Sequence, residues 1–247
     1  MSCTRPQLVA ELSRVDGRRE VTLETISKRL CASGLMASNG PYCAPAHMGW
    51  PDAVNLLIGS NAALTAAEAP EVVARFRAFR PRLITSAGSE DRLPSEISDA
   101  ETFGAALEAL IATVPVIEES FLDLIQRKYP TALPSVHSRL AFGPMAVIGI
   151  EVECTRGAVD TGVIRLVSCF ERPKVDLEIA FDAEADSSAA LGGDRLVTSR
   201  VGFPTLRALY AAVSDRSIGA AAAPAFSLGE GTSGDVPGGA PRRESVQ

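Results

Sequence analysis

The sequence has no long apolar run and very little histidine, the side chain that serves most often as a general base and as a metal ligand. Its 247 residues include two histidines, and no segment approaches the ~18 consecutive apolar residues that a membrane helix needs. Charged side chains interrupt residues 1–20, so this segment lacks the apolar core of a secretory signal. A hydrophobic share of 46% is ordinary for a folded domain. We therefore expect a folded cytoplasmic protein with no membrane partner.

Short catalytic motifs are also missing. The chain contains no G-x-S-x-G nucleophile elbow, no P-loop and no dinucleotide-binding fingerprint. His137 is expected in a loop with Pro and Ser, without a recognisable Ser-His-Asp arrangement. The sequence predicts a protein that is not an enzyme and carries no cofactor.

The cysteines give little support to a disulfide framework or to a metal site. There are five of them: Cys3, Cys31, Cys43, Cys154 and Cys169. An odd number without an export signal favours reduced thiols. Cys31, Cys43 and His47 could form a zinc site, but they lack the close C-x₂-C pair typical of one. The alternative is a half-buried cysteine followed by polar loop residues, and on that interpretation we expect no metal.

Charge is distributed unevenly along the chain. Residues 1–92 carry 11 Lys and Arg against 9 Asp and Glu, whereas residues 93–247 carry 13 against 21. A slightly basic front joined to an acidic back indicates an anionic partner for the front. The overall charge of −6 argues against a general nucleic-acid coat.

Apolar spacing predicts a helical domain over residues 1–85. Helices are expected over residues 5–15 and 23–33, from 50 to 59, and from 65 or 70 to 79. A loop over residues 37–49, rich in Gly, Pro, Asn and Ser, separates the second helix from the third.

The remainder of the chain predicts an α+β domain over residues 98–215, after a linker at 83–97. Helices are expected at 99–113 and 116–128, followed by alternating strands at 145–154, 163–170 and 174–182 in an antiparallel meander that the two helices cover. A further strand at 196–201 and a helix at 204–213 follow. Residues 219–247 are rich in Ala, Gly, Pro and Ser, which predicts a disordered tail.

The front domain resembles a helix-turn-helix or winged-helix module. Four apolar side chains would brace its first two helices: Leu8, Leu12, Ile26 and Leu30. The outer face of the second helix would then meet a DNA groove, and the loop at 37–49 would form a wing. The residues predicted to contact bases or phosphates are Thr25, Ser27, Lys28 and Arg29, with Arg18 and Arg19 holding phosphates from the preceding turn.

The segment TISKRLCASGLMASNGPYCAPAHMGWPDAVNLLIG also resembles part of a group of uncharacterised phage or prophage proteins of alphaproteobacteria. There, a helix ending in LREAGL precedes a glycine-rich loop and a helix of the type PEDAANLLLAL. The resemblance covers about residues 5–60 and implies a DNA-associated role. This chain departs from the pattern at Tyr42, Cys43 and His47, where glycine and basic residues often stand.

Two other charged groups have alternative interpretations. The arginines at 75, 77, 80 and 82 could follow a phosphate backbone or form a solvated helix face. The carboxylates Glu151, Glu153, Asp176, Glu178 and Asp182 could hold metals, but their alternation is typical of a solvated or docking sheet face.

The sequence thus predicts a DNA-binding regulator of phage or prophage origin whose partner is double-stranded DNA. The acidic domain would form a homodimer or recruit another protein. The alternative is a structural or adaptor module in which the helical domain binds a protein and the arginines are surface charge.

Overall fold

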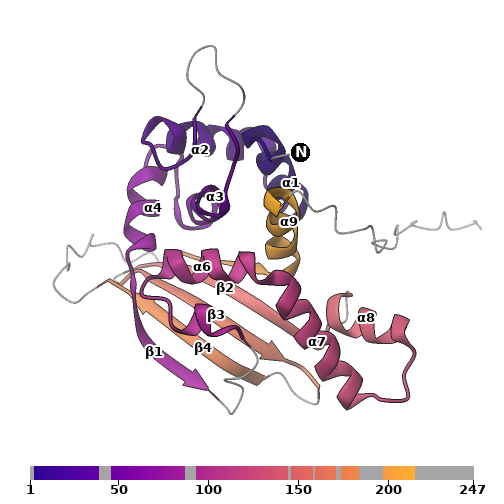
Figure 1. The fold of residues 1–247 in the computed structure, drawn as a ribbon. Coiled ribbons are helices and arrows are strands. Elements are labelled where there is room, and N and C mark those ends of the chain that lie inside the picture. Colours follow the sequence, from indigo (N-terminus) through magenta and orange to yellow (C-terminus); the bar gives the residue numbers. More distant parts are fainter. Residues whose placement is uncertain are drawn as a thin grey trace, which may run out of the picture. The chain divides into compact units, whose positions relative to one another are not determined.

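The computed structural model describes residues 3–38, 46–86, 93–143, 146–157, 159–170, 174–183 and 197–214. Its helices are α1 (Arg5–Asp16), α2 (Glu20–Ala32), α3 (Trp50–Ala62), α4 (Ala69–Arg77), α5 (Ser95–Ser98), α6 (Phe103–Ala112), α7 (Val114–Lys128), α8 (Pro134–Phe142) and α9 (Phe203–Ser214). Its strands are β1 (Arg80–Ser86), β2 (Ile148–Arg156), β3 (Thr161–Ser168), β4 (Lys174–Asp182) and β5 (Val197–Gly202) (Figure 1). The predicted disordered tail lies outside the described residues.

The strands form one antiparallel sheet in the order β1-β4-β3-β2-β5. The predicted meander is confirmed, because β2 pairs with β3 and β3 with β4. Side chains alternate across the sheet as the sequence indicates: Ile150, Val152 and Ile164 are buried on one face. The mixed α+β class is therefore correct.

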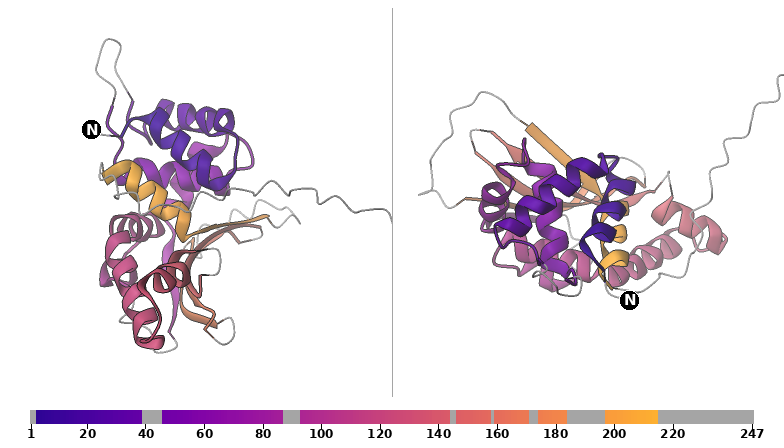
Figure 2. Two further views of the ribbon diagram at one scale, coloured as in Figure 1. Left: turned by 90° about the vertical axis from the view of Figure 1, so that its right-hand side faces the viewer. Right: turned by 90° about the horizontal axis from the view of Figure 1, so that it is seen from above.

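Helices cover the apolar face of the sheet (Figure 2). The contact between α6 and the sheet depends on a ring packed over a glycine. Phe103 is fully buried with its ring centroid 5.3 Å from that of Phe181, and a Cβ atom added at Gly162 would lie 2.8 Å from the Phe103 ring. A flat aromatic side chain can approach the strand this closely only because residue 162 has no side chain.

The linker predicted over residues 83–97 is wrong over its described parts. Residues 80–86 form β1, an edge strand hydrogen-bonded to β4, and residues 95–98 form the short helix α5. Pro81 and the largely exposed side chains of β1 hide it from a search for alternation. Such features are common on edge strands, which need only one hydrogen-bonded neighbour.

The predicted boundary between residues 85 and 98 does not separate two domains. Residues Met1–Arg216 form one compact unit, because β1 belongs to the sheet of the back part and α9 packs against α1 (Figures 1 and 2). The ring of Trp50, at the start of α3, stacks on that of Tyr210 in α9, with centroids 5.7 Å apart. The helices of the front part and the last helix, α9, therefore pack into the same apolar core.

The segment around His137, interpreted as a loop from its Pro and Ser content, is the helix α8. It is short and buries only His137 and Ala141, so it gives almost no apolar periodicity. In the part of the chain that the structure describes, no helix has both the length and the apolar character to span a bilayer.

Candidate functional site

The first two helices pack against each other and are joined by a short turn, as expected from the sequence. Gly17 ends α1 in the left-handed conformation, with φ of 71°, and its N–H donates to the carbonyl of Ser13. Residues 17–19 connect the helices, and α2 begins at Glu20. The four bracing residues named from the sequence are all buried: Leu8, Leu12, Ile26 and Leu30.

The outward face of α2 carries most of the predicted contact residues. Thr25, Lys28 and Arg29 are exposed, and so is Arg19 in the preceding turn. Lys28 Nζ lies 2.9 Å from Glu24 Oε1, and both side chains of this ion pair are exposed to solvent. Because exposed ion pairs contribute little to stability, the Lys28 ammonium can exchange this partner for another anion at small cost.

Ser27 does not belong to this face. It is fully buried, and its hydroxyl donates to the carbonyl of Glu24 at 2.9 Å. The prediction that Ser27 contacts DNA is therefore wrong. Its position follows from helical spacing, since Ser27 is four residues after Leu23 and three before Leu30, both buried.

Arg18 is also misassigned as a phosphate contact. Its guanidinium is 2.6 Å from Asp16 Oδ2 and donates to Asn61 Oδ1 at 3.1 Å and to Ser199 Oγ at 3.3 Å. Asn61 is buried at the end of α3, and Ser199 belongs to β5. Arg18 thus ties the turn before α2 to α3 and the sheet.

Replacing Arg18 by alanine should lower the free energy of unfolding by about 2 kcal/mol, because Asp16 and Asn61 lose a charged hydrogen-bonding partner. Arg19→Ala is the matched control, since it removes an exposed guanidinium from the next residue and should change stability by less than about 0.5 kcal/mol. Urea denaturation of both variants measures the difference. Equal stabilities would show that the Arg18 contacts do not hold the turn.

The predicted wing lies partly outside the described residues, because residues 39–45 are not described. Its two ends are fastened by the buried Asp52 of α3. One carboxylate oxygen accepts the N–H of Ala37 at 2.7 Å and the other accepts the N–H of Gly49 at 2.8 Å. The loop therefore leaves and rejoins the structure at fixed points beside the start of α3.

The arginines at positions 75, 77, 80 and 82 have local partners. Arg75 Nη2 lies 2.6 Å from Asp160 Oδ2, Arg77 contacts Glu108 and Asn55, and Arg82 Nη1 lies 2.8 Å from Asp182 Oδ2. Arg80 is exposed and also has a partner. Arg75, Arg77 and Arg82 are thus paired with carboxylates of other segments, which neither the phosphate-track nor the solvated-face interpretation anticipated.

The polar face of the sheet carries a row of alternating charges across four strands. Arg200 of β5 and Arg165 of β3 each donate to Glu153 Oε2 of β2 at 2.7 Å, and Arg165 also donates to Glu178 of β4 at 2.6 Å. Burial raises the pKa of Glu153, but the hydrogen bonds from the two arginines outweigh burial and hold that pKa below 4.5. These carboxylates are neutralised by arginine.

Because of this row of charges, the free energy of unfolding depends on pH. A carboxyl with a lowered folded-state pKa contributes stability that is present above its unfolded pKa of about 4.5 and lost as pH falls through its folded value. Glu153→Gln should therefore cost about 2 kcal/mol at pH 7 and flatten the fall of stability below pH 4.5. Urea denaturation from pH 3 to 7 tests this prediction, with Glu151→Gln, which leaves the Glu153 pairs intact, as control. Parallel pH profiles for Glu153→Gln and wild type would contradict it.

The zinc interpretation gains no support. Cys43 lies outside the described residues, and no group of three or more His, Cys, Asp or Glu side chains suited to a metal occurs among those described. Burial raises the pKa of the Cys154 thiol to about 12 and also raises that of Cys3. Both are protonated thiols at neutral pH and pack as apolar side chains.

No protein-family model, curated protein or solved structure matches this chain.

Proposed function

We propose that this protein binds double-stranded DNA through the outward face of α2 and the turn before it, and acts as a DNA-binding regulator. The observation that carries the proposal is the division of α2 into two faces. Leu23, Ile26 and Leu30 are buried inward, whereas Thr25, Lys28 and Arg29 are exposed outward.

The dimensions of α2 suit a DNA groove. Its 13 residues span about 20 Å at ~1.5 Å per residue, and the major groove of B-DNA is about 12 Å wide and admits one helix. Packing against α1 and α3 fixes the helix on its inner side. A helix held in this way presents its outer side chains without first having to fold on its target.

The cations of this face have distinct roles in the proposal. Arg19 sits at the N-terminal cap of α2, where it would contact a phosphate, and Lys28 and Arg29 would contact phosphates or base edges between two and three turns later. The Thr25 hydroxyl donates to the carbonyl of Val21 at 2.8 Å, and its oxygen would accept a hydrogen bond from a donor on a base edge. Arg18 and Ser27 are left out, because their side chains are engaged elsewhere.

The second candidate function is a protein-interaction module that uses the same face. It is favoured by Val21, which is 74% exposed at the start of α2, four residues before Thr25. Glu20 and Glu24 also offset part of the positive charge of the helix. An adaptor would use the apolar side chain, whereas DNA binding would use the cations.

Binding of a fluorescent random-sequence duplex to the full chain, followed by anisotropy, separates the two candidates. We expect micromolar or tighter binding at low salt and a slope of log K against log salt of about −3, from three neutralised phosphates. No anisotropy change at micromolar protein in low salt would rule out DNA and leave the adaptor.

A further inference from the structure

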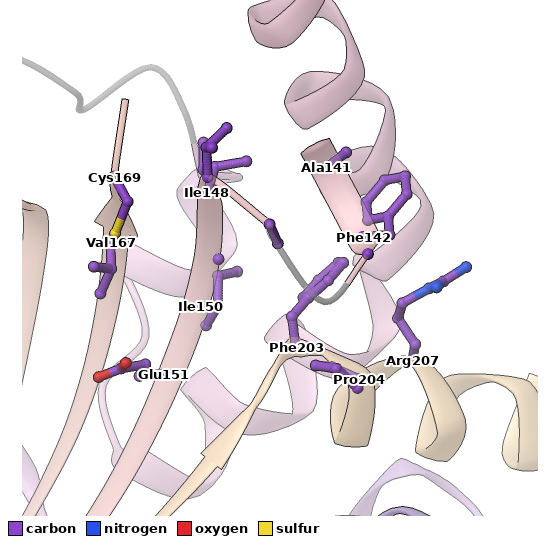
Figure 3. A pocket seen from close by; sticks show the side chains of 14 residues that line it. Ala141, Phe142, Ile148, Ile150, Glu151, Val167, Cys169, Phe203, Pro204 and Arg207 are labelled. Carbon is purple, nitrogen blue, oxygen red and sulfur yellow. The ribbon is translucent and has the colours of Figure 1, made fainter. Parts of the chain in front are cut away.

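A cavity of about 230 Å³ lies where the end of α8, the first residues of β2 and the start of α9 meet (Figure 3). One wall consists of Phe142 and Phe203, whose ring centroids are 6.1 Å apart with an angle of 24° between the planes. Ile148 and Ile150 of β2 lie on the other side (Figure 3). The enclosing side chains are largely apolar, which is typical of sites for small organic molecules.

The cavity also borders main chain that has a strand neighbour on one side only. β3 pairs with β2 from Ile148 onward, whereas β5 pairs with β2 only from Glu151 to Arg156. β5 then ends at Gly202, and the chain turns into α9 at Phe203. Residues 148–150 line the cavity where β5 is absent, so those of their N–H and C=O groups that do not face β3 can hydrogen-bond a guest.

Gly149 is the feature of this wall that packing does not explain. Among the described residues, nothing lies within 4 Å of the position that a Cβ atom would occupy at Gly149. Gly162 in the neighbouring strand is different, because the Phe103 ring fills that space. A glycine inside a strand weakens it and often marks a place where a ligand approaches the backbone closely.

The charges around the cavity disfavour an anionic guest, because Glu151 brings a carboxylate to its lining. Arg207 forms an ion pair with Glu118, and its guanidinium lies over the Phe142 ring, 5.0 Å from the centroid. In Figure 3 this guanidinium points away from Ile148 and Ile150. The arginine is therefore already neutralised and does not select an anion inside the cavity.

The volume sets the size of the guest. An apolar cavity of about 150 Å³ takes up benzene, so about 230 Å³ has room for two fused rings. Aromatic walls favour an aromatic guest through offset or edge-to-face contacts. A single hydrogen-bond donor on the guest would suit the open edge of β2.

We propose that this cavity binds one small neutral bicyclic aromatic molecule of the indole class. Its rings lie between Phe203 and residues 148–150 of β2, and its N–H donates to a main-chain carbonyl of that segment. The site is separate from α2, so the proposal stands whether or not the protein binds DNA.

Isothermal titration of the full chain with indole tests the proposal. We expect saturable binding with one site per chain, and affinity at least tenfold lower for indole-3-carboxylate, which brings a charge into an apolar space. Gly149→Ile should weaken indole binding by at least about tenfold, or 1.4 kcal/mol, because its side chain fills the cavity from a strand position that favours isoleucine.

Ala180→Ile is the matched control, since it places the same isoleucine side chain at a strand position outside the cavity and should leave indole affinity unchanged. Ala146→Leu fills the cavity from the segment before β2 and serves if Gly149→Ile does not fold. Absence of saturable binding, or equal affinity in wild type and a folded filled variant, would overturn the proposal.

Discussion

Replacing Lys28 and Arg29 together by glutamate should reduce affinity for duplex DNA by about a hundredfold or more at low salt and leave the helix content unchanged. Each lost phosphate contact removes roughly one counterion from the binding equilibrium. Two losses of about 1.4 kcal/mol correspond to a hundredfold change, and the new carboxylates add repulsion. The salt dependence of the residual binding should fall by about two units of slope.

The matched control is Arg127→Glu with Arg139→Glu, which changes the net charge equally at exposed positions of α7 and α8. Anisotropy with the same duplex at two salt concentrations should show near wild-type binding for this control. Equal losses in both double variants would mean that net charge, and not the face of α2, decides the affinity. Wild-type affinity in the Lys28 and Arg29 variant would remove α2 from the interface.

Substitutions at two neighbouring residues distinguish an effect on stability from an effect on DNA binding. Arg18→Ala should lower stability through lost contacts to Asp16 and Asn61, whereas Arg19→Ala should lower DNA affinity and leave stability unchanged. A general loss of function by unfolding would affect both variants in proportion to their stability. A loss of stability in Arg18→Ala together with a loss of affinity in Arg19→Ala is therefore expected only if Arg19 belongs to the proposed interface.

Gly162→Val should produce the largest loss of stability among the substitutions considered, about 3 kcal/mol or more, or prevent folding. The added Cβ would lie 2.8 Å from the ring of Phe103, which is fully buried, so the ring or the strand would have to shift within the core. Overpacking a close-packed core typically costs 1–3 kcal/mol, and more where the neighbour cannot shift.

Gly149→Val is the matched control, because it makes the same change in the adjacent strand β2 at a position with open space. Urea denaturation should show little change for this variant, or a small gain, since valine favours extended backbone. If the two variants are equally stable, the contact between Phe103 and residue 162 does not determine the packing of α6.

Local patterns are enough to place most elements of the fold. The apolar spacing of residues 5–15 and 23–33 predicts α1 and α2, and alternation from 145 to 182 predicts three strands and their antiparallel order. Trp50 and Pro51 correctly mark the start of α3. These features are set by interactions within a few residues, so the sequence carries them directly.

Elements held by distant partners do not appear in such patterns. β1 has exposed side chains and exists because its backbone pairs with β4, about a hundred residues later. α8 buries two side chains and depends on packing against α7 and β2. The cavity lies where β5 has ended opposite Glu151, so that residues 148–150 of β2 have no neighbour on that side. This depends on how the two strands are aligned and not on the sequence of either one.

The candidate site also contains one residue whose role the sequence could have given and one whose role it could not. Helical spacing alone could have removed Ser27 from the predicted DNA contacts, since it shares the face of Leu23 and Leu30. Arg18 could not have been removed, because its partners Asn61 and Ser199 are brought to it by α3 and β5.

The sequence by itself determined the helices, the meander and the exposed positions Thr25, Lys28 and Arg29, since helix and strand periods decide which side chains share a face. Only the tertiary structure decided that residues Met1–Arg216 form one unit and that most of the other arginines considered for nucleic-acid contact are internal ties. The physical reason is that a guanidinium binds whichever carboxylate or amide the fold brings within reach, and residue spacing does not contain that information.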